Sequence, residues 1–104
     1  LNRLAPNLPT TGEVKVPCPE DKKVETVAAI TEAFSGFESS TIDGVRVRFN
    51  DESGNQKAWY LARKSNTEPI LVMRVEARDQ STLDEILAMI DDRVAPIIDI
   101  SKLL

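Results

Sequence analysis

The apolar and polar positions along the chain predict five short strands. The predicted strands are residues 13–16, 37–42, 45–49, 57–63 and 70–78, and alternation is clearest in 13–16 and 45–49. Because successive side chains of a strand point to opposite faces, each segment is predicted to place one face toward a core. In the last segment the predicted core face consists of Leu71, Met73, Val75 and Ala77. Asp43-Gly44, between the second and third strands, predicts a two-residue type I′ turn.

Two other segments carry the period of an amphipathic helix. In the first, the stripe predicted to face the core is Val24, Val27, Ala28, Thr31 and Phe34, and Gly36 ends the helix. In the second, the stripe is Leu83, Ile86, Leu87, Ile90 and Val94, and Pro96 ends the helix. Ser81, with Asp84 three residues later, is the predicted N-cap of this second helix.

The order of elements is therefore β-α-β-β-β-β-α. It predicts an α+β fold in which an antiparallel sheet of four to five strands carries two helices on one face. Residues 1–12 show no periodicity and are predicted to be a linker from a preceding domain, and residues 13–95 form the domain. The apolar tail 96–104 is expected either to pack on a neighbouring domain or to fray. The first residue is not Met, and a linker leading into one domain fits an excised C-terminal piece.

Composition and charge restrict the functional classes. A net charge of −4 argues against a nucleic-acid surface, although residues 44–78 hold seven basic residues against four acidic ones. The single cysteine, Cys18, suits a reducing compartment, and no apolar run approaches the ~18 residues of a membrane span. We therefore expect a cytoplasmic protein that binds neither membrane nor nucleic acid. With no histidine in the chain, there is no imidazole base to activate Cys18.

The segment between the last two strands, 63–69, carries more hydrogen-bond donors than a turn requires. Arg63 supplies a planar fork of N–H groups and Lys64 supplies an ammonium, while Ser65, Asn66 and Thr67 add short polar side chains. A guanidinium binds a phosphate through two parallel hydrogen bonds, and hydroxyls and amides can fill its remaining lone pairs. This composition suits an oxyanion site. It also suits an ordinary solvated turn, and the residues alone leave both interpretations open.

A resemblance favours the first interpretation. The run Arg63-Lys64-Ser65-Asn66-Thr67-Glu68-Pro69, followed by Ile70 to Ala77, resembles the phosphate-binding loop and next strand of the α-D-phosphohexomutase superfamily. Asp43 to Phe49 resembles that family's preceding hairpin. The similarity covers about residues 12–92 and concerns the family's C-terminal domain only, nearest to the phosphomannomutase/phosphoglucomutase branch. It implies a TATA-binding-protein-like arrangement of the sheet and helices, which carries no implication of DNA binding.

The resemblance implies a function for this loop. Arg63, Ser65, Asn66 and Thr67 would bind the non-transferring phosphate of a hexose phosphate, with Lys64 and Arg74 as possible supporting groups. A phosphoserine on another domain would transfer the phosphoryl group between the 1- and 6-positions. The complete enzyme would use Mg²⁺ and a hexose 1,6-bisphosphate, neither of them held by this domain.

No catalytic residue and no metal site are assigned to this chain itself. The preceding domains of the same polypeptide are the expected partners, and the 104 residues alone are expected to be inactive. The alternative that remains open is a non-catalytic protein-interaction module that uses the sheet face or the apolar tail.

Overall fold

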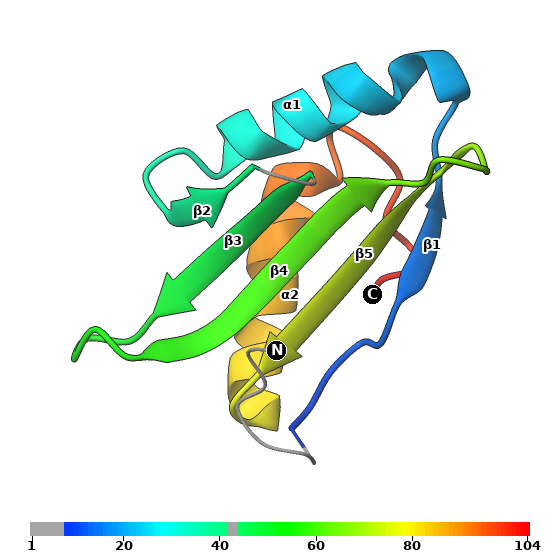
Figure 1. The fold of residues 1–104 in the computed structure, drawn as a ribbon. Coiled ribbons are helices and arrows are strands. Elements are labelled where there is room, and N and C mark those ends of the chain that lie inside the picture. The colour runs from blue at the N-terminus through cyan, green and yellow to red at the C-terminus, as the bar shows by residue number, and fades with distance from the viewer. Residues whose placement is uncertain (1–7, 42–43) are drawn as a thin grey trace.

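A computed structural model describes residues 8–41 and 44–104. It forms one antiparallel five-stranded sheet in the order β1-β5-β4-β3-β2 (Figure 1). The strands are β1 (Val14–Pro17), β2 (Glu38–Ser40), β3 (Val45–Asn50), β4 (Gln56–Lys64) and β5 (Ile70–Ala77). The helices are α1 (Lys23–Ala33), which follows the short 3₁₀ turn η1 (Glu20–Lys22), and α2 (Gln80–Val94). The predicted α+β class and the order of elements are confirmed.

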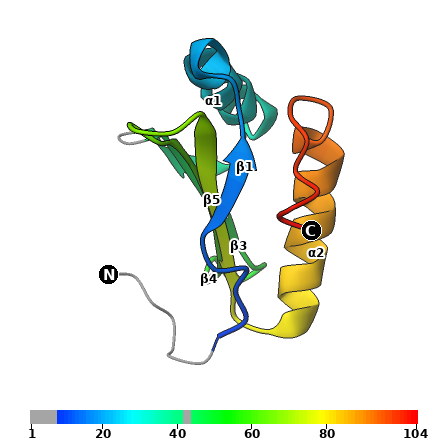
Figure 2. The ribbon, with the colours of Figure 1, turned by 90° about the vertical axis from the view of Figure 1, so that its right-hand side faces the viewer.

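The two helices meet the sheet differently. In Figure 2, α2 runs along one face of the sheet, while α1 lies across the end at which β4 finishes and β5 begins. The opposite face carries no helix from residues 8–41 or 44–104. Both helices contribute side chains to one hydrophobic core, in which Phe34 lies 5.7 Å from Tyr60 between ring centroids.

The alternation of the strands is as predicted. Leu71, Met73, Val75 and Ala77 of β5 are fully buried on the helix side. Tyr60 lies on the same side, whereas its neighbour Trp59 faces the other way and is covered by the guanidinium of Arg46, 4.7 Å from the ring centroid.

The buried face of α1 differs from the prediction. Its buried residues are Lys23, Thr26 and Ile30, whereas Val24 is 68% exposed and Ala28 is exposed. Polar residues can occupy this face because they find partners there. The Cys18 thiol lies 3.7 Å from the Thr26 hydroxyl, and the Lys23 ammonium reaches a backbone carbonyl. Of the predicted stripe, only Phe34, at the C-cap, is fully buried.

Helix α2 follows its predicted stripe, but its N-cap is Asp79 rather than Ser81. Asp79 has extended backbone angles, φ −155° and ψ 169°, and its Oδ1 accepts a hydrogen bond from the Thr82 N–H at 2.7 Å. An N-cap residue must lie outside the helix, whereas Ser81 lies within the first turn.

The turn predicted at Asp43-Gly44 lies partly outside the described residues, since 42–43 are not described. Gly44 itself has φ +113°, and a Cβ there would lie 2.5 Å from the Ala62 carbonyl oxygen. Glycine is therefore needed where the chain enters β3 beside the end of β4.

The two ends of the described chain pack on the domain. Ala77 donates its N–H to the Pro9 carbonyl and Thr11 donates to the Val75 carbonyl, so residues 9–11 line the edge of β5 beyond β1. Residues 1–7 of the expected linker lie outside the described part. In the tail, Ile100 and Leu103 are buried in the core, which corrects the expectation that the segment frays. Within the described ranges, every helix is too short or too polar to cross a membrane.

Candidate functional site

The candidate site is the connection between β4 and β5. Arg63 and Lys64 are the last two residues of β4, and Ile70 begins β5. The Ser65 N–H donates to the Ile70 carbonyl at 3.2 Å, which closes the base of the loop. A rigid two-stranded support therefore carries the polar loop 65–69.

Ser65 organises the inside of this loop. Its Oγ accepts hydrogen bonds from the backbone N–H groups of Thr67 and Glu68, both at 3.2 Å, and lies 3.4 Å from the Thr67 hydroxyl. Serine commonly stabilises tight turns in this way. The N–H groups of Thr67 and Glu68 are thus engaged within the loop, and either hydroxyl can donate in the contact between Ser65 and Thr67.

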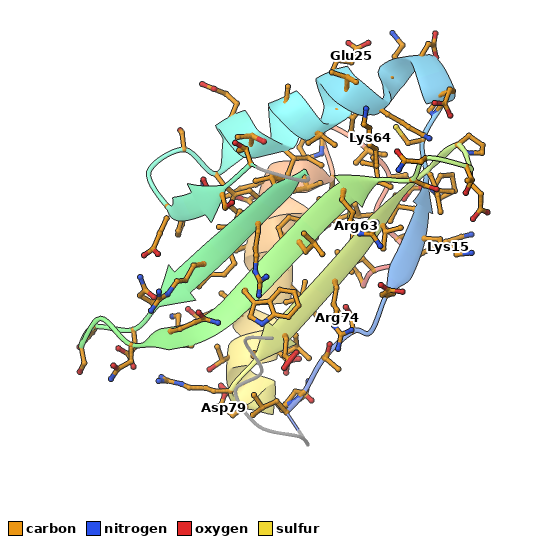
Figure 3. All side chains as sticks on the ribbon, in the orientation of Figure 1. Lys15, Glu25, Arg63, Lys64, Arg74 and Asp79 are labelled. Atoms are coloured by element: carbon orange, nitrogen blue, oxygen red, sulfur yellow. The ribbon has the colours of Figure 1, made fainter. Side chains whose placement is uncertain are left out.

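Arg63 and Lys64 point to opposite sides, as neighbours on a strand do. Figure 3 shows Arg63 on the sheet face away from α2, and Lys64 near α1. The Arg63 side chain is 44% exposed, and its Nη2 lies 3.9 Å from the Glu13 carboxylate. An exposed pair at this distance contributes little, so the guanidinium can exchange Glu13 for another anion.

A pocket of about 380 Å³ lies between this loop and α1. Its polar wall contains Arg63, Lys64 and Asn66. Its other walls are formed by Val24, Val27, Ala28 and Thr31 of α1, together with Thr41 and Gly44. Apart from Phe34, the stripe of α1 that was predicted to face the core therefore lines this pocket. Ser65 and Thr67 lie in the loop but do not line it.

Arg74 lies apart from the loop, on β5. Leu61 pairs with Arg74, and Arg63 pairs with Val72. The two arginines therefore lie on the same sheet face, on neighbouring strands, in cross-strand pairs that are two positions apart along the strands. The Arg74 guanidinium lies 5.9 Å from the centre of the Trp59 ring. Arg74 can therefore add positive potential near Arg63 without lining the pocket.

Lys23 is a residue of this site that the sequence did not indicate. Its side chain is only 2% exposed, and its Nζ donates to the Ser65 carbonyl at 2.6 Å and contacts Glu20 at 2.8 Å. A signal was present, since a cation in the first turn of a helix is opposed by the helix dipole and needs another reason to be there.

Glu68 is turned toward Lys15 of β1, with 3.4 Å between the Lys15 Nζ and the Glu68 Oε1. A carboxylate beside an anion site would repel the ligand, and this ion pair draws it toward β1. Lys15 and Glu68 are both exposed, so the pair contributes little to stability.

The chain resembles known proteins over most of its length. Residues 13–93 match the family described as the phosphoglucomutase/phosphomannomutase C-terminal domain. A phosphoglucomutase from Neisseria gonorrhoeae is 40% identical over 77% of this chain and 18% of its own length. A phosphomannomutase/phosphoglucomutase from Pseudomonas syringae pv. tomato is 33% identical over 91% of the chain and 20% of its own length. A phosphoglucosamine mutase from Methanococcus aeolicus is 38% identical over 70% of the chain and 16% of its own length.

The fold is shared with a solved structure. The crystal structure of a phosphoglucomutase/phosphomannomutase family protein from Burkholderia thailandensis superposes with a TM-score of 0.66 and 28% identity. The superposition covers 88% of this chain and 18% of that one. The chain thus spans about a fifth of the length of the relatives it matches. On the matched residues 13–93, this chain belongs to the phosphoglucomutase/phosphomannomutase family as a C-terminal domain.

Proposed function

We propose that this chain is the phosphate-anchoring domain of a phosphohexomutase. Its loop would bind the non-transferring phosphate of a hexose phosphate through Arg63, Ser65, Asn66 and Thr67. The observation that carries the proposal is the exposed Arg63 guanidinium at the end of β4, whose 3.9 Å contact with Glu13 leaves it open to another anion. Arg63 and Asn66 both belong to the lining of the adjoining pocket. The family membership and the mutase names of the relatives support the substrate class.

In this scheme the chemistry takes place on the other domains of the polypeptide. A phosphoserine there transfers its phosphoryl group to the free hydroxyl of the hexose phosphate, which gives a bisphosphate and a serine hydroxyl. The bisphosphate turns over, and the serine takes back the other phosphoryl group. The loop therefore holds one phosphate and then the other, so it must recognise phosphate rather than one face of a sugar.

The contribution of the loop is positioning. Much of phosphoryl-transfer catalysis depends on placing the reacting oxygens and stabilising their charge. One charge pair between Arg63 and a phosphate at about 4 Å is worth about 4 kcal/mol at an effective dielectric constant of about 20, before desolvation. Binding energy at the remote end of the substrate can thus be used to orient the reacting end.

Mg²⁺ and the bisphosphate belong to the other domains in this proposal. Among the residues the structure describes, no three His, Cys, Asp or Glu side chains gather as a metal site would require. The isolated chain is expected to bind phosphate without catalysing mutase turnover.

The test is a pair of arginine variants. Inorganic phosphate titrated into the isotope-labelled chain should bind with millimolar affinity, about −4 kcal/mol. Arg63→Ala should weaken binding about tenfold, because it removes the bidentate partner. Arg48→Ala is the matched control, since Arg48 is also an exposed arginine of the sheet, 41% exposed and paired with Glu38. Equal affinities for wild type and Arg63→Ala would refute the assignment.

The alternative function, a protein-interaction module, would use the sheet face or the apolar tail. Two apolar residues of the tail, Ile100 and Leu103, are buried in the core of this domain and are not available to a partner.

A further inference from the structure

Lys23 is a buried cation at a position where an apolar side chain would fill the space at less cost. Removing an ammonium from water is expensive unless it is paired and hydrogen-bonded. Its ion-pair partner Glu20 is 76% exposed, so the carboxylate stays in solvent while the ammonium lies beneath the loop. The other contact of Lys23 is the Ser65 carbonyl, 42 residues away in sequence, at 2.6 Å. This second contact explains why the Lys23 ammonium is buried.

The contact orients the peptide that joins Ser65 to Asn66. The described residues contain no cis peptide bond, so the C=O and the N–H of this peptide point in opposite directions. Because the Ser65 C=O points toward Lys23, the Asn66 N–H points away from Lys23, on the outward side of this peptide.

This outward N–H is the loop amide that is left for a ligand. The N–H groups of Thr67 and Glu68 donate to Ser65 Oγ, and the Ser65 N–H donates across the base of the loop. Over residues 8–41 and 44–104, the Asn66 N–H finds no hydrogen-bond acceptor. Asn66 also lines the pocket beside Arg63.

We propose that Lys23 is the positioning residue of this loop, which fixes and polarises the Ser65–Asn66 peptide so that the Asn66 N–H donates to the bound phosphate. An ammonium that donates to a carbonyl draws electron density from the peptide, and chains of hydrogen bonds strengthen one another by roughly 10–30% per bond. The inference rests on the proposed function and extends it, since it assigns a part to a residue of α1 that does not touch the ligand.

The experiment is a titration of inorganic phosphate into isotope-labelled wild type and Lys23→Met, followed by amide NMR. Methionine fills a similar volume without charge. In wild type the Asn66 amide proton should move downfield more than any other amide. In Lys23→Met this shift should be largely lost, affinity should fall about tenfold, and amide hydrogen exchange at residues 65–68 should quicken even without phosphate.

Lys22→Met is the matched control. Lys22 precedes Lys23 and carries the same charge, but it is exposed and pairs with Glu25 at 3.5 Å. We expect Lys22→Met to keep the Asn66 shift and to bind phosphate nearly as well as wild type. An equal loss of affinity in both variants would mean that Lys23 acts only through net charge, and the inference would be overturned.

The outcomes also separate this inference from the proposed function. If phosphate moves no amide of residues 63–68 in wild type, the proposed function fails. If wild type binds phosphate at the loop but Lys23→Met keeps the same Asn66 shift and affinity, only the Lys23 inference fails.

If Lys23→Met does not fold, as judged from the Phe34 and Tyr60 ring signals, the inference is tested on the wild-type chain instead. The Lys23 ammonium protons should then be visible through slow exchange and should shift together with the Asn66 amide when phosphate binds. If the chemical shift of the Lys23 ammonium stays unchanged while phosphate shifts the loop amides, the inference is overturned.

Discussion

Tyr60 shows most directly how burial alters the chemistry of a single side chain. It is fully buried, and among the described residues its hydroxyl has one partner, the Met73 sulfur at 3.3 Å. Desolvation raises the pKa of Tyr60 above its ordinary value of 10.0. The folded protein therefore strongly favours the neutral phenol.

Tyr60 should make the protein sensitive to alkali. Its contribution to stability is fully present below the unfolded-state pKa of about 10, and it is lost as the pH rises from there toward the higher folded pKa, at about 1.4 kcal/mol per pH unit. Tyr60→Phe removes the ionisable hydroxyl and its weak sulfur contact. Urea unfolding at pH 8 and pH 11 measures the free energy of unfolding at each pH. Between these two pH values it should fall less for Tyr60→Phe than for wild type, and equal falls would contradict this explanation.

At the residue scale, the sequence indicates the site residues whose partners are local. Ser65 bonds within its own loop, and Arg63 and Lys64 follow the alternation of their strand. Lys23 could not be found in the same way, because its partner Ser65 lies 42 residues away and becomes adjacent only when α1 is laid across the end of β4.

At the scale of elements, the two helices differ in how far their pattern predicts their packing. Helix α2 lies along the sheet and buries its apolar stripe. Helix α1 crosses the end of the sheet and buries Lys23 and Thr26, because both find polar partners, while Val24 and Ala28 are left exposed beside the pocket. The period of apolar residues contains no information about such polar partners, so the buried face of α1 was predicted wrongly.

A pair of substitutions tests the register of α1. Ile30 is fully buried and Val24 is 68% exposed. Ile30→Ala should lower the free energy of unfolding by about 3 kcal/mol through lost burial and a cavity. Val24→Ala should change it by less than about 0.5 kcal/mol, as surface substitutions do. Denaturant unfolding of both variants measures this, and a larger loss for Val24→Ala would restore the predicted face.

The N-cap of α2 predicts how the stability of the protein changes at acid pH. The hydrogen bonds from Thr82 lower the pKa of Asp79 below its ordinary value of 3.8. The stability that Asp79 contributes is therefore present above pH 3.8 and is lost as the pH falls through the lower folded pKa. Asp79→Ala should lower the Tm by a few degrees at pH 7 and by less at pH 2.

Ser81→Ala is the control for this cap. Ser81 is exposed within the first turn, so its replacement should leave the Tm nearly unchanged. A larger fall in Tm for Ser81→Ala than for Asp79→Ala would show that the helix begins at the residue the sequence first suggested.

At the scale of the whole molecule, the core extends to the last residues of the chain. Leu103 is buried against the core, whereas its neighbour Leu104 is 55% exposed. Leu103→Ala should lower the free energy of unfolding by about 2 kcal/mol, the lower end for such truncations because the site lies near a chain end. Leu104→Ala should have almost no effect. Calorimetry on the two variants decides between a packed tail and a frayed one.

The fold as a whole was predictable, because the predicted strands and the apolar stripe of α2 all specify the same sheet. The sequence patterns did not predict the contacts that the two ends of the described chain make. Thr11 and Leu103 lie in segments without clear periodicity, and each is held by a strand or core distant in sequence. The pocket was unpredictable for the same reason, since its walls come from α1, the start of β3 and the end of β4.

If the loop between β4 and β5 is a phosphate site, a titration of the wild-type chain with inorganic phosphate, followed by amide NMR, must reveal it. We expect saturable shifts centred on residues 63–67, with the α2 amides unmoved. Saturable shifts confined to other parts of the chain, or no saturable shift at the loop, would rule out the phosphate site.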